Sequence, residues 1–89
     1  MPEINRIHRI SYLKAKPDFL LFVVFDDGKQ VLYDVKEDLN LPGFSALKDI
    51  DGLFNQVRLD ESRTCVFWNK NIDLPSDVIY QYGADIREK

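Results

Sequence analysis

The sequence predicts an α+β fold: a small, mainly antiparallel sheet with short helices packed on one face and a C-terminal helix. Two apolar runs on either side of an Asp-Gly pair predict a central hairpin, and two further segments alternate as strands do. A Pro-Ser-Asp sequence near the end of the chain has the composition of a helix start. Strands joined by short turns, with few helices, are typical of antiparallel α+β domains.

The chain has 89 residues, fewer than the commonest domain size of about 100–150. We therefore expect a single domain over residues 1–89, with an ordered core over about residues 4–83 and a charged tail at 84–89. Hydrophobic residues make up 45% of the chain and charged residues 30%, an ordinary globular composition. No apolar run approaches the roughly 20 residues of a membrane-spanning helix, and the first residues lack a signal-peptide core. These observations predict a cytoplasmic protein.

The first predicted strand covers residues 4–13. Its apolar residues recur at every third position, which fits neither a helix face nor strict alternation. A β-bulge would produce this pattern, because the extra residue changes which side chains face inward. Pro17 then interrupts the strand.

The most secure prediction is a hairpin of two strands. Residues 19–25 are apolar on both faces, which indicates a central and buried strand. Asp27 and Gly28 follow, and this pair favours a tight hairpin turn because both residues tolerate positive φ. The return strand covers residues 30–35, in which apolar residues alternate.

The second half of the chain predicts shorter elements. Residues 36–41 form a turn or a short helix, and 44–47 and 53–54 resemble helical turns laid over the sheet. Residues 56–60 and 64–68 alternate as strands, and the three residues between them are short enough for a hairpin loop.

A final helix is predicted to begin around Leu74 and Pro75, because proline is favoured at a first helical position. Val78, Ile79 and Tyr82 can supply its buried side, and Gly83 is the expected stop.

The net charge of −3 is unevenly distributed. Residues 1–16 carry a balance of +3, and the rest of the chain carries −6. Because an acidic body repels phosphate, bulk nucleic-acid binding is disfavoured, and only the N-terminal segment could contribute to it. The alternative is that its basic residues are the solvated side of an edge strand. These residues are Arg6, Arg9, Lys14 and Lys16.

The sequence shows no recognisable catalytic unit, so we predict no enzyme activity, no cofactor and no metal. The one histidine, His8, would have to act with Cys65 or a serine, but Cys65 lies in an apolar strand pattern typical of a buried residue. A single cysteine also excludes an internal disulfide. A calcium loop starting at Asp49 fails, because Phe54 stands where glycine is needed and Asp60 where glutamate is needed.

Aromatic residues near the C-terminus provide a candidate protein-binding surface. Trp68 and Asn69 are adjacent, and Tyr80 lies on the final helix. Tryptophan and tyrosine are enriched at binding hot spots, but large aromatics also dominate the cores of small domains, so Trp68 could be core or surface. The candidate interaction residues are Arg6, Arg9, Trp68, Asn69 and Tyr80.

The order and spacing of six segments resemble the bacterial family called domain of unknown function 2442. The resemblance covers about residues 4–82. One departure is Lys70-Asn71, where the family usually places Asn-Gly. Asparagine tolerates the positive φ of such a turn, so the turn can form here as well. The segments are 25–29 (FDDGK), 33–35 (YDV), 44–49 (FSALKD), 54–60 (FNQVRLD), 66–69 (VFWN) and 72–80 (IDLPSDVIY).

The resemblance implies a small α+β domain with a mainly antiparallel sheet and no established activity or catalytic residues. It also implies a genetic context: relatives are often encoded beside a second small family, domain of unknown function 4160, in an arrangement that resembles a toxin–antitoxin pair. Some relatives carry a fused helix-turn-helix domain, for which this chain has no room. We therefore expect a non-enzymatic protein-interaction domain with an antitoxin-like role, whose partner is the product of an adjacent gene.

Two other hypotheses remain open from the sequence. The basic N-terminal strand could make the chain an accessory nucleic-acid-binding domain, and homo-oligomers could form through an exposed sheet edge.

Overall fold

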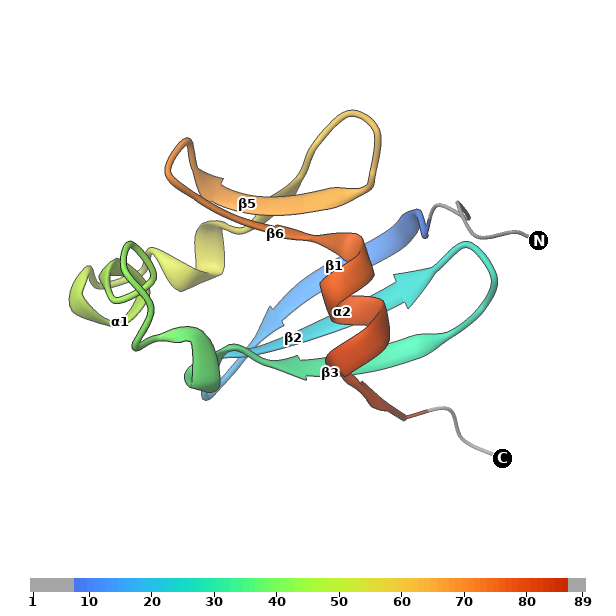
Figure 1. Ribbon diagram of the computed structural model, residues 1–89, viewed down its shortest axis with the longest axis horizontal. Helices are drawn as coiled ribbons and strands as arrows, with labels where there is room; N and C mark the ends of the chain where they lie inside the picture. Colours follow the sequence, from blue (N-terminus) through green and yellow to red (C-terminus); the bar gives the residue numbers. More distant parts are fainter. Residues whose placement is uncertain (1–7, 87–89) are drawn as a thin grey trace.

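The computed structural model describes residues 8–86, and these form two antiparallel sheets and a few short helices (Figure 1). The four-stranded sheet has the order β1-β2-β3-β7, with strands β1 (Ile10–Lys16), β2 (Leu20–Phe25), β3 (Gln30–Asp34) and β7 (Ala84–Asp85). The three-stranded sheet has the order β4-β5-β6, with strands β4 (Arg58–Leu59), β5 (Cys65–Asn69) and β6 (Ile72–Pro75). The predicted α+β class with antiparallel sheets is confirmed.

The first strand is displaced from its predicted position. β1 pairs with β2 from Ile10 to Lys16, three residues beyond the expected end. The predicted bulge is confirmed: the register shifts between Ile10 and Tyr12, and the Ser11 hydroxyl donates to the Val24 carbonyl at 3.1 Å. Residues 4–7 of the prediction, and Arg6 among them, lie outside the described residues.

The central hairpin is confirmed at its turn. Gly28 has a φ of +93°, and its N–H donates to the Phe25 carbonyl at 2.8 Å. The Asp27 carboxylate accepts from the Lys29 N–H at 2.9 Å, which closes the turn from the other side. β2 is central, as predicted, because it lies between β1 and β3, but it is buried on one face only: Leu21, Val23 and Phe25 are buried, whereas the residues that alternate with them are partly exposed.

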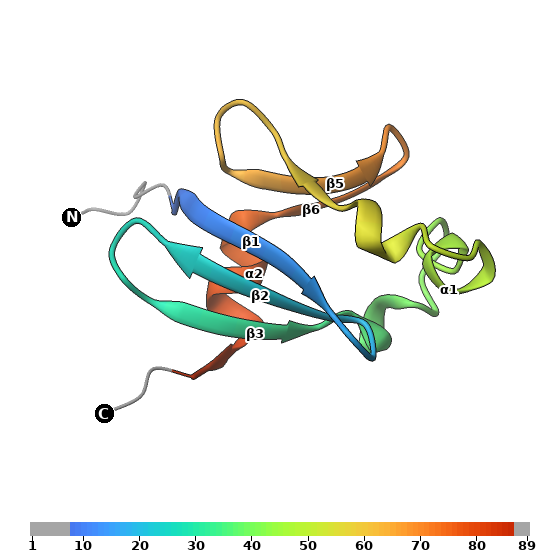
Figure 2. The same cartoon turned by 180° about the vertical axis from the view of Figure 1, so that it is seen from behind.

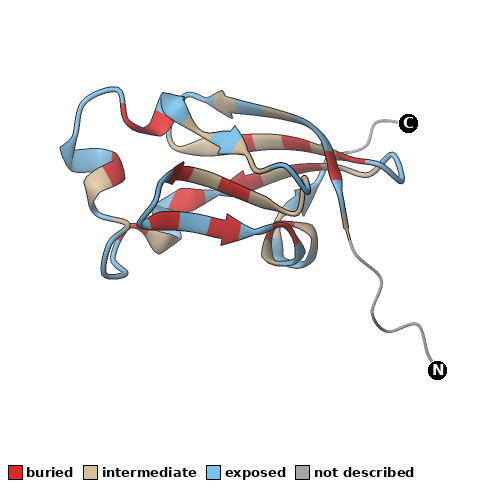
Figure 3. Cartoon of the chain, turned by 90° about the horizontal axis from the view of Figure 1, so that it is seen from above, coloured by how far each residue is buried: buried red, intermediate tan, exposed pale blue. Residues whose placement is uncertain are grey.

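One core fills the space between the inner face of the four-stranded sheet, the helix α2 (Ser76–Tyr82) and the three-stranded sheet (Figures 1 and 3). The shorter helices are η1 (Val35–Asp38), α1 (Ala46–Asp49) and η2 (Phe54–Gln56). α2 contacts both β3 and β6, and so it joins the two sheets. Residues that contribute most to this core include Leu21, Val23, Phe25, Val31, Val66, Trp68, Ile72 and Ile79.

Gly83 ends α2 where the sequence predicts, but for a different reason. Its φ is −75°, so no left-handed conformation is involved. A Cβ on this residue would lie 2.1 Å from Val31 Cγ1 and 2.8 Å from the Ile79 carbonyl oxygen. Glycine is therefore needed because the chain passes directly over β3.

The C-terminal part of the sequence contains two strands that the sequence pattern did not predict. β6 occupies residues in front of α2, so Pro75 is the last residue of a strand and precedes the first helical residue. The tail expected at 84–89 is wrong for its first residues: β7 pairs with β3, and the Ile86 N–H donates to the Gln30 carbonyl at 3.0 Å. Residues 87–89 lie outside the described residues.

Candidate interaction surfaces

A groove of about 380 Å³ opens between η1 and α2, beside the end of β3. The segment that forms η1 turns as soon as β3 ends, because the Asp34 side chain accepts the Lys36 N–H at 2.9 Å and caps the helix. α2 lies across β3 and closes the other side (Figure 1). We call this feature the acidic groove; it is lined by Tyr33, Asp34, Glu37, Asp38, Val78 and Tyr82.

Tyr33 forms the inner wall of the acidic groove. Its hydroxyl donates to Asp38 Oδ2 at 2.6 Å. Burial, followed by this hydrogen bond to a carboxylate, raises the pKa of Tyr33 well above its usual value. The phenol is therefore neutral at physiological pH and holds the Asp38 carboxylate in place.

The carboxylates of the acidic groove differ in what neutralises them. Asp34 Oδ1 lies 3.2 Å from Lys36 Nζ. No cation of the described residues lies within ion-pair distance of Glu37 or Asp38. The groove therefore carries uncompensated negative charge on its η1 side.

The opposite wall of the groove contains an exposed aromatic ring. Tyr82 is 70% exposed, although the sequence pattern assigned it to the buried side of the final helix. That prediction is wrong for Tyr82 because the helix buries Ile79 and packs Val78 and Tyr80 against the core, whereas the chain turns toward β3 directly after Tyr82.

A second surface is the outer face of the four-stranded sheet, which points away from the core (Figure 2). Paired residues of antiparallel strands share a face, so the register places three rows of side chains here. The rows are Tyr12, Val24 and Gln30; Lys14, Phe22, Leu32 and Ala84; and Lys16, Leu20 and Asp34. Tyr12 is 49% exposed and packs edge-to-face on Phe22 at 6.0 Å between ring centroids.

Tyr80 joins three separate segments instead of standing free on the helix. Its hydroxyl donates to Asp27 Oδ2 at 2.6 Å, and its ring stacks on His8 at 3.7 Å. Lys29 Nζ lies 4.0 Å above the same ring. The Tyr80 hydrogen bond, followed by the Lys29 backbone N–H, lowers the pKa of Asp27. Tyr80 therefore fastens the hairpin turn to α2.

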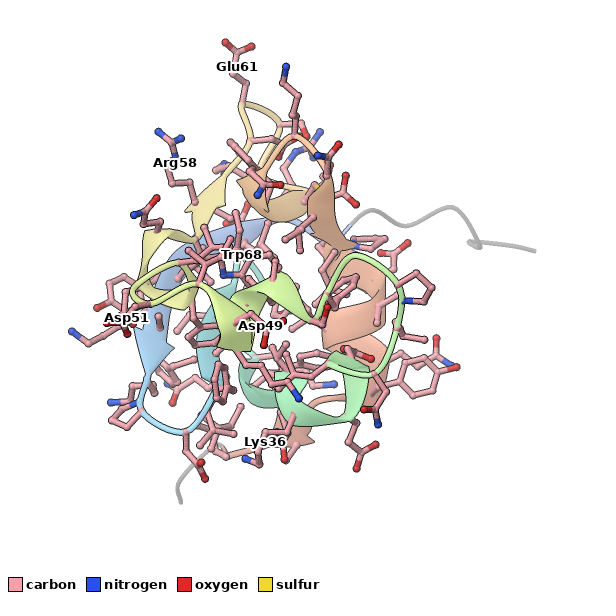
Figure 4. All side chains as sticks on the ribbon, turned by 90° about the vertical axis from the view of Figure 1, so that its left-hand side faces the viewer. Lys36, Asp49, Asp51, Arg58, Glu61 and Trp68 are labelled. Atoms are coloured by element: carbon pink, nitrogen blue, oxygen red, sulfur yellow. The ribbon has the colours of Figure 1, made fainter. Side chains whose placement is uncertain are left out.

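Trp68 belongs to the core, so its place among candidate surface residues is wrong. It is 2% exposed, and its Nε1 donates to the Phe54 carbonyl at 3.0 Å. Figure 4 shows its ring inside the molecule, whereas Arg58 and Glu61 point outward. Alternation along β5 turns Trp68 inward and leaves the next residue outside.

The remaining candidate residues do not meet in one site. Asn69 is exposed, and its Oδ1 accepts the Asn71 N–H at 2.8 Å, which shapes the turn between β5 and β6. The turn expected at Lys70-Asn71 is present between β5 and β6, but Asn71 is not among the described residues with positive φ, so the turn does not use the left-handed conformation that asparagine tolerates. Arg9 is exposed, and its carbonyl accepts the Asp26 N–H at 2.9 Å.

The residues considered for chemistry are held apart. His8 contacts the rings of Tyr80 and Phe25. The Cys65 thiol donates to the Val66 carbonyl, and burial raises its pKa. Within residues 8–86 no cluster of three or more potential ligands could hold a metal ion. Figure 4 shows the Asp49 and Asp51 side chains apart from each other.

The groove combines residues that are far apart in the sequence. Glu37 and Asp38 lie in a segment predicted to be a turn or a short helix, and Tyr82 follows more than 40 residues later. No local pattern groups them, because η1 and α2 come together only through tertiary packing.

No helix in the described part of the chain has the length and apolar character needed to cross a membrane. No curated protein and no solved structure is significantly similar to the chain. The sequence model of one family, "Protein of unknown function (DUF2442)", matches residues 10–85, which include both sheets and α2. The chain therefore belongs to the DUF2442 family.

Proposed function

We propose that this chain is a non-enzymatic protein-interaction domain that binds a basic segment of a partner protein in the acidic groove. The observation that carries the proposal is the pair Glu37 and Asp38, which face a concave surface without a described cation beside them. Three other carboxylates, Asp18, Asp26 and Asp34, already have a lysine or arginine partner.

The shape of the groove suits a lysine or arginine side chain of the partner. Its Val78 side would accept the aliphatic stem, and the exposed Tyr82 ring offers a π face for the charged end. Hydrogen bonds between a cation and a carboxylate are stronger than those between neutral groups. The surplus of negative charge outside the N-terminal segment would also speed the encounter with a basic partner.

The resemblance to two-gene arrangements suggests which partner to test first. We expect a small basic protein encoded by an adjacent gene, which the chain would bind in the cytoplasm and, in an antitoxin-like role, inhibit. Affinity purification of the tagged chain from its host, followed by mass spectrometry, should recover that protein in equal amount. Purification without any protein partner, together with no binding of the purified neighbour, would contradict the proposal.

A direct test uses a fluorescent lysine-rich peptide and measures anisotropy at low salt. Glu37→Gln combined with Asp38→Asn should weaken binding about tenfold or more, because it removes both uncompensated charges. Asp49→Asn combined with Asp51→Asn is the matched control, since it also removes two charges and both residues are exposed outside the acidic groove. Equal weakening by both variants would mean that binding follows total charge and not the groove.

Nucleic-acid binding through the basic N-terminal strand remains the second candidate. The observation in its favour is that Lys14 and Lys16 share the outer face with Tyr12 and Phe22, and aromatic rings on a sheet can stack on bases. A single-stranded oligonucleotide should then bind at low salt, and replacing Lys14 and Lys16 by alanine should abolish the binding.

A further inference from the structure

The outer face of the four-stranded sheet is apolar along its centre. Leu20, Phe22, Val24 and Leu32 are partly exposed there, and none of them packs against the core. An antiparallel sheet with one free face normally places polar residues on it. Among residues 8–86, no helix or strand lies over this face (Figure 2).

The polar residues of this face are arranged at opposite sides of the apolar centre. Lys16 is on β1 and Asp34 is on β3, and both are paired with Leu20 of β2, which separates them. The two contacts of Asp34 with Lys36 both use Oδ1, so Oδ2 has no partner among the described residues.

We propose that a second copy of this chain covers the outer face, so that the protein forms a face-to-face dimer. The two-fold axis would run along β2, and Phe22 of each copy would pack on Phe22 of the other. This axis exchanges β1 and β3, so Lys16 of each copy lies opposite Asp34 of the other. Such an interface is self-complementary, as a two-fold interface must be.

The resulting arrangement follows known packing rules. Two sheets stack about 10 Å apart with their strands nearly aligned, and an apolar centre with a charged rim is the usual anatomy of an interface.

The charges on the outer face favour a second copy over other partners. A basic partner would be repelled by Lys14 and Lys16, and a nucleic acid by Asp34. A second copy supplies both signs of charge where they are needed. The inference shares Asp34 with the rim of the acidic groove, but it does not use Glu37 and Asp38, which lie on η1 and carry the proposed peptide binding.

The test is sedimentation equilibrium of the full chain from about 1 to about 200 µM. We expect a monomer–dimer equilibrium for the wild type. Phe22→Thr should remove the dimer, because it replaces the central apolar contact by a polar residue that still favours a strand. Lys16→Asp should raise the Kd about tenfold, because each copy then places an acid opposite Asp34.

Two further variants make the result specific. Asp34→Asn in the Lys16→Asp background should restore most of the lost affinity, since asparagine keeps the helix cap but removes the repelling charge. Lys70→Asp is the matched control, because Lys70 is exposed on the turn between β5 and β6, away from this face, and its Kd should equal that of the wild type. Circular dichroism shows whether each variant folds; if Phe22→Thr unfolds, the Lys16 and Asp34 variants still decide.

A wild type that is monomeric at every concentration would overturn the proposal. So would a dimer that Phe22→Thr and Lys16→Asp leave intact. A monomer that binds an oligonucleotide through Lys14 and Lys16 would also overturn it and would assign the face to nucleic acid. A protein that stays monomeric could still bind the lysine-rich peptide through Glu37 and Asp38, so the two proposals are tested separately.

Discussion

The two faces of the four-stranded sheet are built from the same kind of residue but have different surroundings. Along β2, Leu21, Val23 and Phe25 are 0–1% exposed and lie in the core, whereas Leu20, Phe22 and Val24 alternate with them on the outside. The inner face is covered by α2 and the second sheet. Apolar composition alone therefore does not show that a sheet face is buried within the chain. The outer face has the apolar composition of an interface.

The contrast between the two faces is tested most directly by shortening two adjacent leucine side chains of β2, one on each face. Leu21→Ala should lower the free energy of unfolding by about 2–5 kcal/mol, the usual cost of a cavity in a core. Leu20→Ala, the same substitution one residue away, should cost less than about 1 kcal/mol at a concentration where the protein is monomeric. Urea unfolding followed by circular dichroism measures both. Equal costs at low concentration would mean that the outer face is already covered within one chain.

The contact of α2 with the inner face provides the next largest effect. Gly83→Ala should cost about 1–3 kcal/mol, because the added methyl group meets Val31 Cγ1 and forces α2 away from β3. Gly28→Ala and Gly52→Ala are useful comparisons, since nothing lies within 4 Å of a Cβ at either position but both have positive φ. If Gly83→Ala costs less than these two, close approach is not the reason for the glycine.

A substitution at Trp68 tests the part of the core that lies against the three-stranded sheet. Trp68→Phe removes the hydrogen bond to the Phe54 carbonyl and part of the ring, and should cost about 1–2 kcal/mol. Thermal unfolding by circular dichroism measures the loss. An unchanged midpoint would contradict the assignment of Trp68 to the core.

The smallest effect is expected at the hairpin turn. The pKa of Asp27 is lowered in the folded protein, so its contribution to stability is present above its unfolded pKa of about 3.9 and is lost as pH falls through the lower folded pKa. Tyr80→Phe removes the main cause and should cost at most about 1 kcal/mol near neutral pH, and less in acid. NMR titration should show the Asp27 pKa returning toward its usual value, whereas Tyr82→Phe should not move it.

Local chemistry explains which parts of the fold could be predicted from the sequence. The Asp27-Gly28 turn, the bulge near Ser11 and the position of β2 depend on residues close together in the chain, and the structure confirms them. The sequence pattern does not predict β6, because Pro75 favours the start of a helix, although Ile72 and Leu74 alternate as a strand does. β7 was missed because two residues are too few to show a pattern.

The candidate surfaces were harder to predict for a different reason. The acidic groove joins residues of η1 to Tyr82, and the sheet rows join β1 to β3; both depend on tertiary packing. The apolar character of β2 was visible, but a single sequence does not indicate whether a second element of the same chain or another molecule covers each face. Tyr80 was noticed as an aromatic residue, but its role in holding Asp27 depends on a contact across 53 residues.

The most direct measurement is the concentration dependence of the unfolding midpoint in three proteins: the wild type, Leu20→Ala and Leu21→Ala. If a second copy covers the outer face, the wild-type midpoint rises with protein concentration, because association stabilises the folded state by mass action. Leu20→Ala should remove most of that rise, whereas Leu21→Ala should lower the midpoint at every concentration and keep the rise. A wild-type midpoint that is independent of concentration would contradict the account.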